Sequence, residues 1–119
     1  FISTVRALSF FMIQRNGINF INLLQGALHA ACGNGHLSII EFLLDNSADI
    51  NKQDNQRMSP LHSAIYQKHL AACKLILKYE QVSNQNIESG ITMSLIAKSS
   101  EIQALMEKAL KSRRKVILV

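Results

Sequence analysis

Three side chains of the types that bind zinc lie within one short stretch of the chain: His29, Cys32 and His36. Their order and spacing, His-x-x-Cys-x-x-x-His, suit a zinc site. The stretch recurs later in the chain, where the equivalent positions are His62, Ile65 and His69. Because the cysteine position is apolar in the second copy, the repeat does not preserve a ligand set. The sequence therefore predicts no metal and no other cofactor.

Residue combinations that could carry out catalysis do not stand out either. Ser59 has the position of a helix cap, and Ser63 lies beside a histidine that recurs in both copies. There is no evident pair of carboxylates. Gly33-Asn34-Gly35 ends a helix, whereas a phosphate-binding loop would open one after a strand. We therefore predict that the chain is not an enzyme and binds no small-molecule substrate.

The elements that carry these residues are indicated by the apolar pattern of residues 27–51. Leu28, Ala31 and Cys32 form one apolar stripe, and Gly33-Asn34-Gly35 stops that helix because glycine tolerates positive φ. A second, wider stripe follows at helical spacing, formed by Leu37, Ile40, Phe42, Leu43 and Leu44. A helix pair this small cannot bury its own apolar face, so it needs copies of itself as neighbours.

Such a copy is present. When the sequence is aligned with itself so that Leu28-His29 matches Leu61-His62, His36-Leu37 also matches His69-Leu70. The second copy reads Ser59-Pro60-Leu61-His62-Ser63-Ala64, which resembles the Thr-Pro-Leu-His-x-Ala signature of ankyrin repeats. Two other stretches are similar to further parts of that repeat, Gly35-His36-Leu37 and Ala48-Asp49-Ile50-Asn51. The resemblance implies an all-α ankyrin-repeat solenoid of stacked helix-turn-helix units with short hairpin-like turns. It also implies that four histidines are structural: His29, His36, His62 and His69.

On this interpretation the whole chain is one ankyrin-repeat domain. Its predicted parts are a truncated repeat at about residues 1–22, full repeats at about 23–53 and 54–86, a degenerate capping repeat at about 87–112, and a basic and apolar tail at 111–119. Residues 20–25 are expected to form an apolar loop, which either packs on a preceding helix or is a contact surface. So few repeats come close to the lower limit for stability, and we expect the domain to be modestly stable.

Two local features of the later repeats are also predicted. Lys68 replaces the usual glycine before His69, so that turn is expected to be strained or differently shaped. In the third repeat, residues 88–92 are expected to keep the turn and the cap, with residues 93–97 in place of Pro-Leu-His-x-Ala. A closing amphipathic helix is expected to turn five residues to the core: Ile102, Leu105, Met106, Ala109 and Leu110.

The net charge of +5 is concentrated at one end of the chain. Four of the positive charges belong to Lys111, Arg113, Arg114 and Lys115, and +5 minus four leaves +1 for the rest. Proteins that bind nucleic acid spread basic residues along a face of the fold, so nucleic acid is not the predicted partner. The tail itself has three open interpretations: a solvated helix end, a patch for nuclear import or an acidic partner, and a nucleic-acid contact.

The setting of the protein is predicted from what the chain lacks. No run of about 18 apolar residues occurs, so no membrane span is predicted. Cys32 and Cys73 are too few for a disulfide scaffold, and both occupy apolar helical positions. We therefore expect a reduced protein of the cytoplasm, with the nucleus as an alternative. Because the chain begins at Phe1 and lacks an initiator methionine, we expect it to be part of a longer protein.

Ankyrin repeats bind partner proteins through their turn tips and the exposed face of the first helix, so the resemblance implies a protein-protein interaction module. Carried over by register, the partner-binding positions of the second repeat are Asn55, Gln56, Met58, Ser63, Tyr66 and Gln67. In the neighbouring repeats they are Gln25, Ala30, Asn34, Glu88, Ser89, Ile91 and Ser99. Tyr66 and Met58 are expected to be the anchors, because large amphipathic or adaptable side chains dominate interfaces. The alternative is that both simply pack along the groove.

Asn51 is a candidate for modification. Leu43 and the Asp49-Ile50-Asn51 stretch resemble the context in which asparaginyl hydroxylases modify animal ankyrin repeats. The alternative is that Asn51 only satisfies backbone groups in the turn.

Two other functions remain open for the chain as a whole. One is a regulatory or targeting region of a larger multidomain protein, an enzyme or effector, whose active part precedes residue 1. The other is a nucleic-acid contact through the basic tail.

Overall fold

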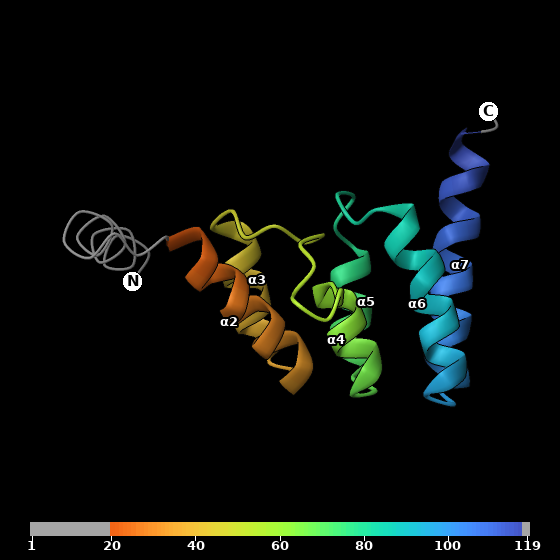
Figure 1. Ribbon diagram of the computed structural model, residues 1–119. Coiled ribbons are helices and arrows are strands. Elements are labelled where there is room, and N and C mark those ends of the chain that lie inside the picture. The colour runs from red at the N-terminus through yellow and green to blue at the C-terminus, as the bar shows by residue number, and fades with distance from the viewer. Residues whose placement is uncertain (1–19, 118–119) are drawn as a thin grey trace.

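The computed structural model describes residues 20–117, and this part of the chain consists of helices joined by turns, without strands. Consecutive helices form pairs, and Figure 1 shows these pairs side by side. The bounds of the helices are α2 Phe20–Asn34, α3 Leu37–Asp45, α4 Pro60–Tyr66, α5 Leu70–Leu77, α6 Asn84–Ile96 and α7 Ser100–Ile117. The truncated repeat predicted at the N-terminus, up to residue 19, lies outside the described residues.

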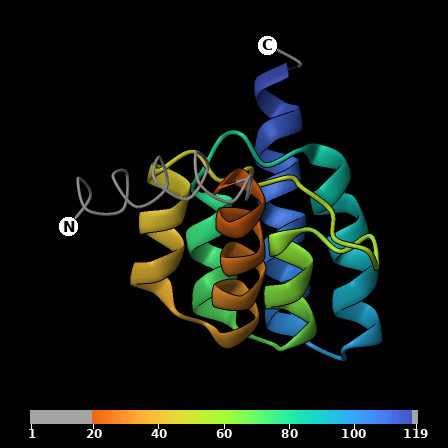
Figure 2. The same cartoon turned by 60° about the vertical axis from the view of Figure 1, so that its left-hand side comes forward.

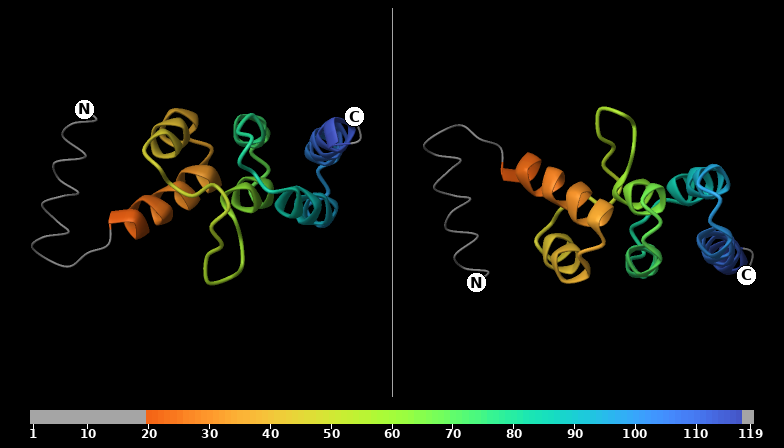
Figure 3. Two further views of the ribbon diagram at one scale, coloured as in Figure 1. Left: turned by 90° about the horizontal axis from the view of Figure 1, so that it is seen from above. Right: turned by 90° about the horizontal axis from the view of Figure 1, so that it is seen from below.

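The helices are arranged in two layers. Viewed from above, α2, α4 and α6 form one row and α3, α5 and α7 form the other (Figure 3). Within the first row α2 packs on α4 and α4 on α6, and within the second α3 packs on α5 and α5 on α7. The turns inside each pair gather at one end of the rows, and the connections between pairs gather at the other (Figure 2). The predicted all-α solenoid is thus confirmed.

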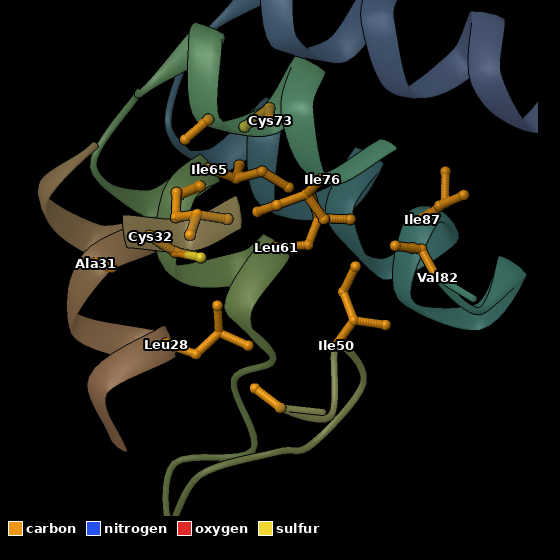
Figure 4. Close-up of a cluster of buried hydrophobic side chains, with 14 of the residues drawn as sticks. Leu28, Ala31, Cys32, Ile50, Leu61, Ile65, Cys73, Ile76, Val82 and Ile87 are labelled. Atoms are coloured by element: carbon orange, nitrogen blue, oxygen red, sulfur yellow. The ribbon is translucent and has the colours of Figure 1, made fainter. Parts of the chain in front are cut away.

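The hydrophobic core runs along the solenoid between the two rows. Leu28 of α2, Leu61 and Ile65 of α4, and Ile76 of α5 are at most 1% exposed and belong to one cluster (Figure 4). Both cysteines lie in this cluster as free thiols, Cys32 on α2 and Cys73 on α5. Burial raises the pKa of each thiol to about 12, so both stay protonated and unreactive.

The start of α2 differs from the sequence-based expectation. Residues 20–25, predicted as a loop, form the first turns of the helix, which begins at Phe20. The physical reason is that Leu24, Leu28 and Ala31 follow one another at i, i+4 and i+7, and all three are buried on one face. Residues 20–25 are therefore helical, and the prediction of a loop is wrong.

The third repeat also differs from its expected register. Residues 88–92, predicted as a turn and cap, lie inside α6, whose N-cap is Ser83, with its hydroxyl accepting from the backbone N–H of Asn86. At the other end of α6 the backbone N–H of Ser99 donates to the carbonyl of Ser94. In the second repeat the backbone N–H of His69 donates to the carbonyl of Ala64 in the same way. Ser94, and not Ala97, is therefore the counterpart of Ala64. The predicted placement of residues 93–97, which paired Ala97 with Ala64, is wrong.

The closing helix follows its expected pattern more closely. Ile102, Met106 and Leu110 of α7 are buried, and Leu105 packs against the core with part of its side chain exposed. At the end of α6, by contrast, Leu95 and Ile96 are 56% and 77% exposed. Hence α7 covers the core, while the last turn of α6 leaves two apolar side chains in water.

The turn inside each helix pair contains one residue in the left-handed conformation. These residues are Gly35 with φ 70°, Lys68 with φ 59° and Lys98 with φ 57°. Only glycine adopts this conformation without steric cost, so two of the three turns carry a lysine at a strained position. The strain expected at Lys68 from the sequence is present.

Replacing Lys68 with glycine should therefore stabilise the domain. We expect Lys68→Gly to raise the free energy of unfolding by about 0.5–1 kcal/mol, because relief of left-handed strain exceeds the entropic cost of glycine. Urea denaturation measures the change. The matched control is Lys74→Gly, which places glycine inside helix α5 and should lower stability by about 1 kcal/mol. A loss of stability in both variants would contradict the expectation.

Candidate functional site

A projecting turn, residues 52–58, is the most prominent feature on the side of the molecule formed by α2, α4 and α6. We call it the finger, and Figure 3 shows it extending beyond that row of helices. Asp54 organises it: the carboxylate oxygen Oδ1 accepts from the backbone N–H groups of Gln56 and Met58, at 2.8 and 2.9 Å. The backbone N–H of Asp54 also donates to the carbonyl of Met58 at 3.0 Å. The finger is thus a closed turn with a defined shape.

His29 fixes the base of the finger to helix α2. Its Nδ1 lies 2.9 Å from the carbonyl oxygen of Gln25, and its Nε2 lies 2.9 Å from the carbonyl oxygen of Met58. The side chain of His29 therefore joins α2 to Met58 at the base of the finger. This contact places Met58 and Gln56 over the groove between α2 and α4.

This groove widens into a hollow of about 550 Å³ between α2, α4 and the finger, which we call the α2–α4 hollow. Most of its lining consists of residues that the sequence predicted as partner-binding: Ala30, Asn34, Gln56, Met58, Ser63, Tyr66 and Gln67. The lining also includes His29, Gly33 and Asp54. The aromatic residue Tyr66 is 63% exposed. Tertiary structure thus brings together residues from two repeats.

A second, smaller hollow of about 270 Å³ lies on the other side of the finger, against α6. We call it the finger–α6 hollow. It shares Gln56 and Met58 with the first, and its other lining residues are Gln53, Arg57, His62, Gln85, Asn86, Ser89 and Met93. The base of the finger therefore separates two adjacent hollows. Of these residues, sequence reasoning missed Gln53, Arg57, Gln85, Asn86 and Met93 as contact positions. The three on α6, Gln85, Asn86 and Met93, were missed because the wrong register of the third repeat hid the face that α6 presents.

Residues 3–89 match the family model described as "Ankyrin repeats (3 copies)". The chain belongs to the ankyrin-repeat family. Ankyrin repeats form a non-catalytic fold that generally serves protein-protein interaction.

Several curated proteins share this ankyrin-repeat region. The chain is 34% identical over 91 residues to "ADP-ribosylation factor GTPase-activating protein AGD2" of Arabidopsis thaliana, a match that covers 75% of this chain and 12% of that protein. It is 43% identical over 53 residues to a "Putative ankyrin repeat protein" of Rickettsia bellii, covering 44% of this chain and 22% of the relative. It is 29% identical over 80 residues to human "BCL-6 corepressor-like protein 1", covering 67% and 4%. The matched region thus spans less than a quarter of each of these relatives.

Some predicted contact residues of this ankyrin-repeat domain do not line the α2–α4 hollow. Gln25 is 8% exposed, and its side-chain amide bonds both the carbonyl and the N–H of Asp49, at 2.8 and 3.0 Å. It joins α2 to the following loop, so its prediction as an exposed contact is wrong. Ile91 is partly buried against the core, and Glu88 and Ser89 lie on α6 rather than on a turn tip. Asn55 is exposed on the finger, and Ser99 lies half-buried at the start of α7.

His62 joins the second ankyrin repeat to the third. Its Nδ1 accepts from the backbone N–H of Ser59 at 3.1 Å, and its Nε2 therefore carries the proton and donates to the hydroxyl of Ser89 at 2.8 Å. His62 is 5% exposed. Desolvation by burial is the main cause that lowers its pKa, so the ring is neutral. Ser59 and His62 together form a capping box at the start of α4.

Asn51 likewise joins two parts of the chain, the loop after α3 and the start of α6. Its Oδ1 accepts from the N–H of Ser83 at 2.9 Å and from the side-chain amide of Asn86 at 3.0 Å, while its Nδ2 donates to the carbonyl of Gln81 at 2.6 Å. The side chain therefore satisfies polar groups at the start of α6. Its hydroxylation stays a prediction.

The His29, Cys32 and His36 trio does not converge in space. His29 faces two carbonyls, Cys32 lies at 0% exposure in the core, and His36 is exposed at the N-cap of α3. Within residues 20–117, no three histidine, cysteine or acidic side chains are grouped so as to hold a metal ion.

The basic tail is partly engaged by the fold. Arg113 of α7 donates to the carbonyls of Val82 and Tyr79, and Arg114 forms an ion pair of 2.5 Å with Glu88 of α6. These contacts use two of the four cationic residues to fix the end of α7. Among the described helices, none is long and apolar enough to cross a bilayer.

Proposed function

We propose that this ankyrin-repeat domain binds a segment of a partner protein in the α2–α4 hollow, with Tyr66 and Met58 as the anchoring side chains. The supporting observation is that this hollow collects an exposed aromatic ring, an adaptable thioether and several amide side chains around one depression. The phenol of Tyr66 and the amides of Gln56 and Gln67 form no hydrogen bond with any described residue, so they are available to a ligand.

The hollow is also preformed, which favours tight binding. His29 and Asp54 hold the finger in place through hydrogen bonds to backbone atoms. A partner therefore does not have to order this surface on binding, and less entropy is lost.

A second proposal concerns the protein of which the domain forms part. The chain spans 12%, 22% and 4% of three relatives that it matches, and one of them is named a GTPase-activating protein. We infer that the domain serves as the interaction or regulatory region of a larger polypeptide. A nucleic-acid contact through the tail receives less support, because Arg113 donates to the carbonyl of Tyr79 and Arg114 forms a surface ion pair with Glu88.

Truncation of the anchors tests the first proposal. We expect Tyr66→Ala and Met58→Ala each to weaken partner binding about tenfold or more, since both residues line the hollow. Affinity capture with wild type and the Tyr66/Met58 double variant identifies the partner, and calorimetric titration then gives the Kd.

The matched control is Lys74→Ala, an exposed position on the opposite row of helices. Its Kd should equal that of wild type, and the melting temperatures of the control and of both anchor variants should stay within a few degrees of wild type. Unchanged affinity in both anchor variants would sink the proposal.

A further inference from the structure

We propose that the partner segment carries two opposite charges: a Lys or Arg side chain that enters the α2–α4 hollow beside Asp54 and Tyr66, and a carboxylate that enters the finger–α6 hollow beside Arg57. This inference rests on the proposed function and deepens it, because it names the chemistry of the ligand. The supporting evidence is the position of Asp54 and Arg57 on the finger.

The two charges of the finger do not neutralise each other. Asp54 and Arg57 are close in sequence, and the N–H of Arg57 donates to the carbonyl of Asp54 at 3.0 Å. The ion pair that the structure contains within residues 20–117 joins Arg114 to Glu88, far from this turn in sequence. The guanidinium of Arg57 forms no hydrogen bond with any described residue. Both charges are therefore available to a ligand.

Asp54 and Arg57 lie against different hollows. Arg57 adopts the left-handed conformation, with φ 64°, which reverses the chain at the tip. Asp54 lines the α2–α4 hollow, and Arg57 lines the finger–α6 hollow. The finger thus presents a fixed pair of opposite charges, one to each hollow.

The α2–α4 hollow has the features of a cation site. Backbone N–H groups, that of Met58 first, hold the pKa of Asp54 below its usual range, so its carboxylate is ionised at neutral pH. Tyr66 lines the same depression with 63% of its surface exposed, and an aromatic face attracts Lys and Arg side chains. No lysine or arginine of the described chain lines this hollow. The remaining titratable group is His29, whose ring nitrogens face two carbonyls.

The finger–α6 hollow has the opposite character. Arg57 is its cation, and its guanidinium can bind a carboxylate through two parallel hydrogen bonds. Gln53 and Gln85 line the same depression, and their side-chain amides can donate further hydrogen bonds to the same carboxylate. Among the described residues no carboxylate lines this hollow, and its other titratable group, His62, is neutral. Because Gln56 and Met58 belong to both hollows, one extended segment crossing the base of the finger can reach both charges.

Selection from a random-peptide display library tests the inference. Wild type, Arg57→Glu and Asp54→Asn are each used as bait, and Lys108→Glu serves as the control because it reverses a charge on the exposed face of α7. Asparagine at position 54 keeps the oxygen that accepts from Gln56 and Met58, so the finger should keep its shape. Circular dichroism confirms that each bait is folded.

We expect the wild-type consensus to contain one basic and one acidic position. Arg57→Glu should lose the acidic position and bind the wild-type consensus peptide about tenfold more weakly, and Asp54→Asn should lose the basic one. The Lys108→Glu consensus should match that of wild type.

The other outcomes overturn the inference in distinguishable ways. Peptides that depend on Tyr66 but show no charged positions would refute it while the proposed function stands. An equal change of consensus in Lys108→Glu would show that net charge alone is sensed, which also refutes it. If no peptide is enriched, or if enriched peptides bind Tyr66→Ala unchanged, the proposed function itself fails and the inference fails with it.

Discussion

Ile65→Ala is expected to lower the free energy of unfolding by about 2–5 kcal/mol, the range for truncating a buried aliphatic side chain. Ile65 is 0% exposed in the last turn of α4, the helix that packs on both α2 and α6. Its Cδ1 reaches so far into the α6 contact that a Cβ added to Gly90 would lie 2.9 Å away. Removing this side chain leaves a cavity where three repeats meet. In a domain of so few repeats, such a loss is a large fraction of the total stability.

Urea denaturation followed by circular dichroism measures this change. Ile96→Ala is the matched control, because Ile96 has the same side chain but is 77% exposed. Its stability should change by less than about 0.5 kcal/mol. The conservative variant Ile65→Val should lose only about 0.5–1.5 kcal/mol. Equal losses at positions 65 and 96 would contradict the assignment of Ile65 to the core.

His62→Ala is expected to cost about 1–3 kcal/mol, because it leaves buried polar groups without partners. The variant removes the acceptor of the Ser59 N–H and the donor to the hydroxyl of Ser89. Ser59 is 0% exposed, so water cannot replace the lost bond without rearrangement. The control is His36→Ala, since His36 is exposed and its side chain makes no hydrogen bond to a described residue.

The same histidine predicts a pH dependence. Burial lowers the pKa of His62 in the folded state below the unfolded value of about 6.5. The stabilisation from a neutral ring is therefore fully present above that unfolded value and is lost as the pH falls through the folded pKa. Wild type should lose more stability than His62→Ala when the pH is lowered from about 7.5 to about 5. Parallel losses in the two proteins would show that other groups control the effect.

Much of the fold could be predicted from short-range pattern alone. The Ser59-Pro60-Leu61-His62 stretch combines a capping hydroxyl with a proline at the first helical position, and α4 begins at Pro60. Apolar residues at helical spacing marked Leu28, Ile40 and Ile102 for the core, and all three are buried. These features are local, so a single sequence is enough to read them.

The candidate site was predicted only in part. Tyr66, Met58 and Asn34 do line one hollow, because the second repeat follows the family period closely. Gln25 was misplaced, since the sequence could not reveal that its amide is buried against Asp49. Arg57 was not singled out, because its role as a contact residue depends on which hollow it lines, and the sequence does not reveal this.

By itself the sequence determined the repeat, the helix pairs and the family, because each depends on residues within about one period of one another. Only tertiary structure decided where α2 and α6 begin and that Ser94 is the counterpart of Ala64. The physical reason is that helix starts depend on competition between local turns and contacts with the neighbouring repeat. Ser83 and Asn86 at the start of α6, for example, both bond Asn51, which belongs to the loop before the second repeat. The two hollows beside the finger likewise arise from contacts between neighbouring repeats.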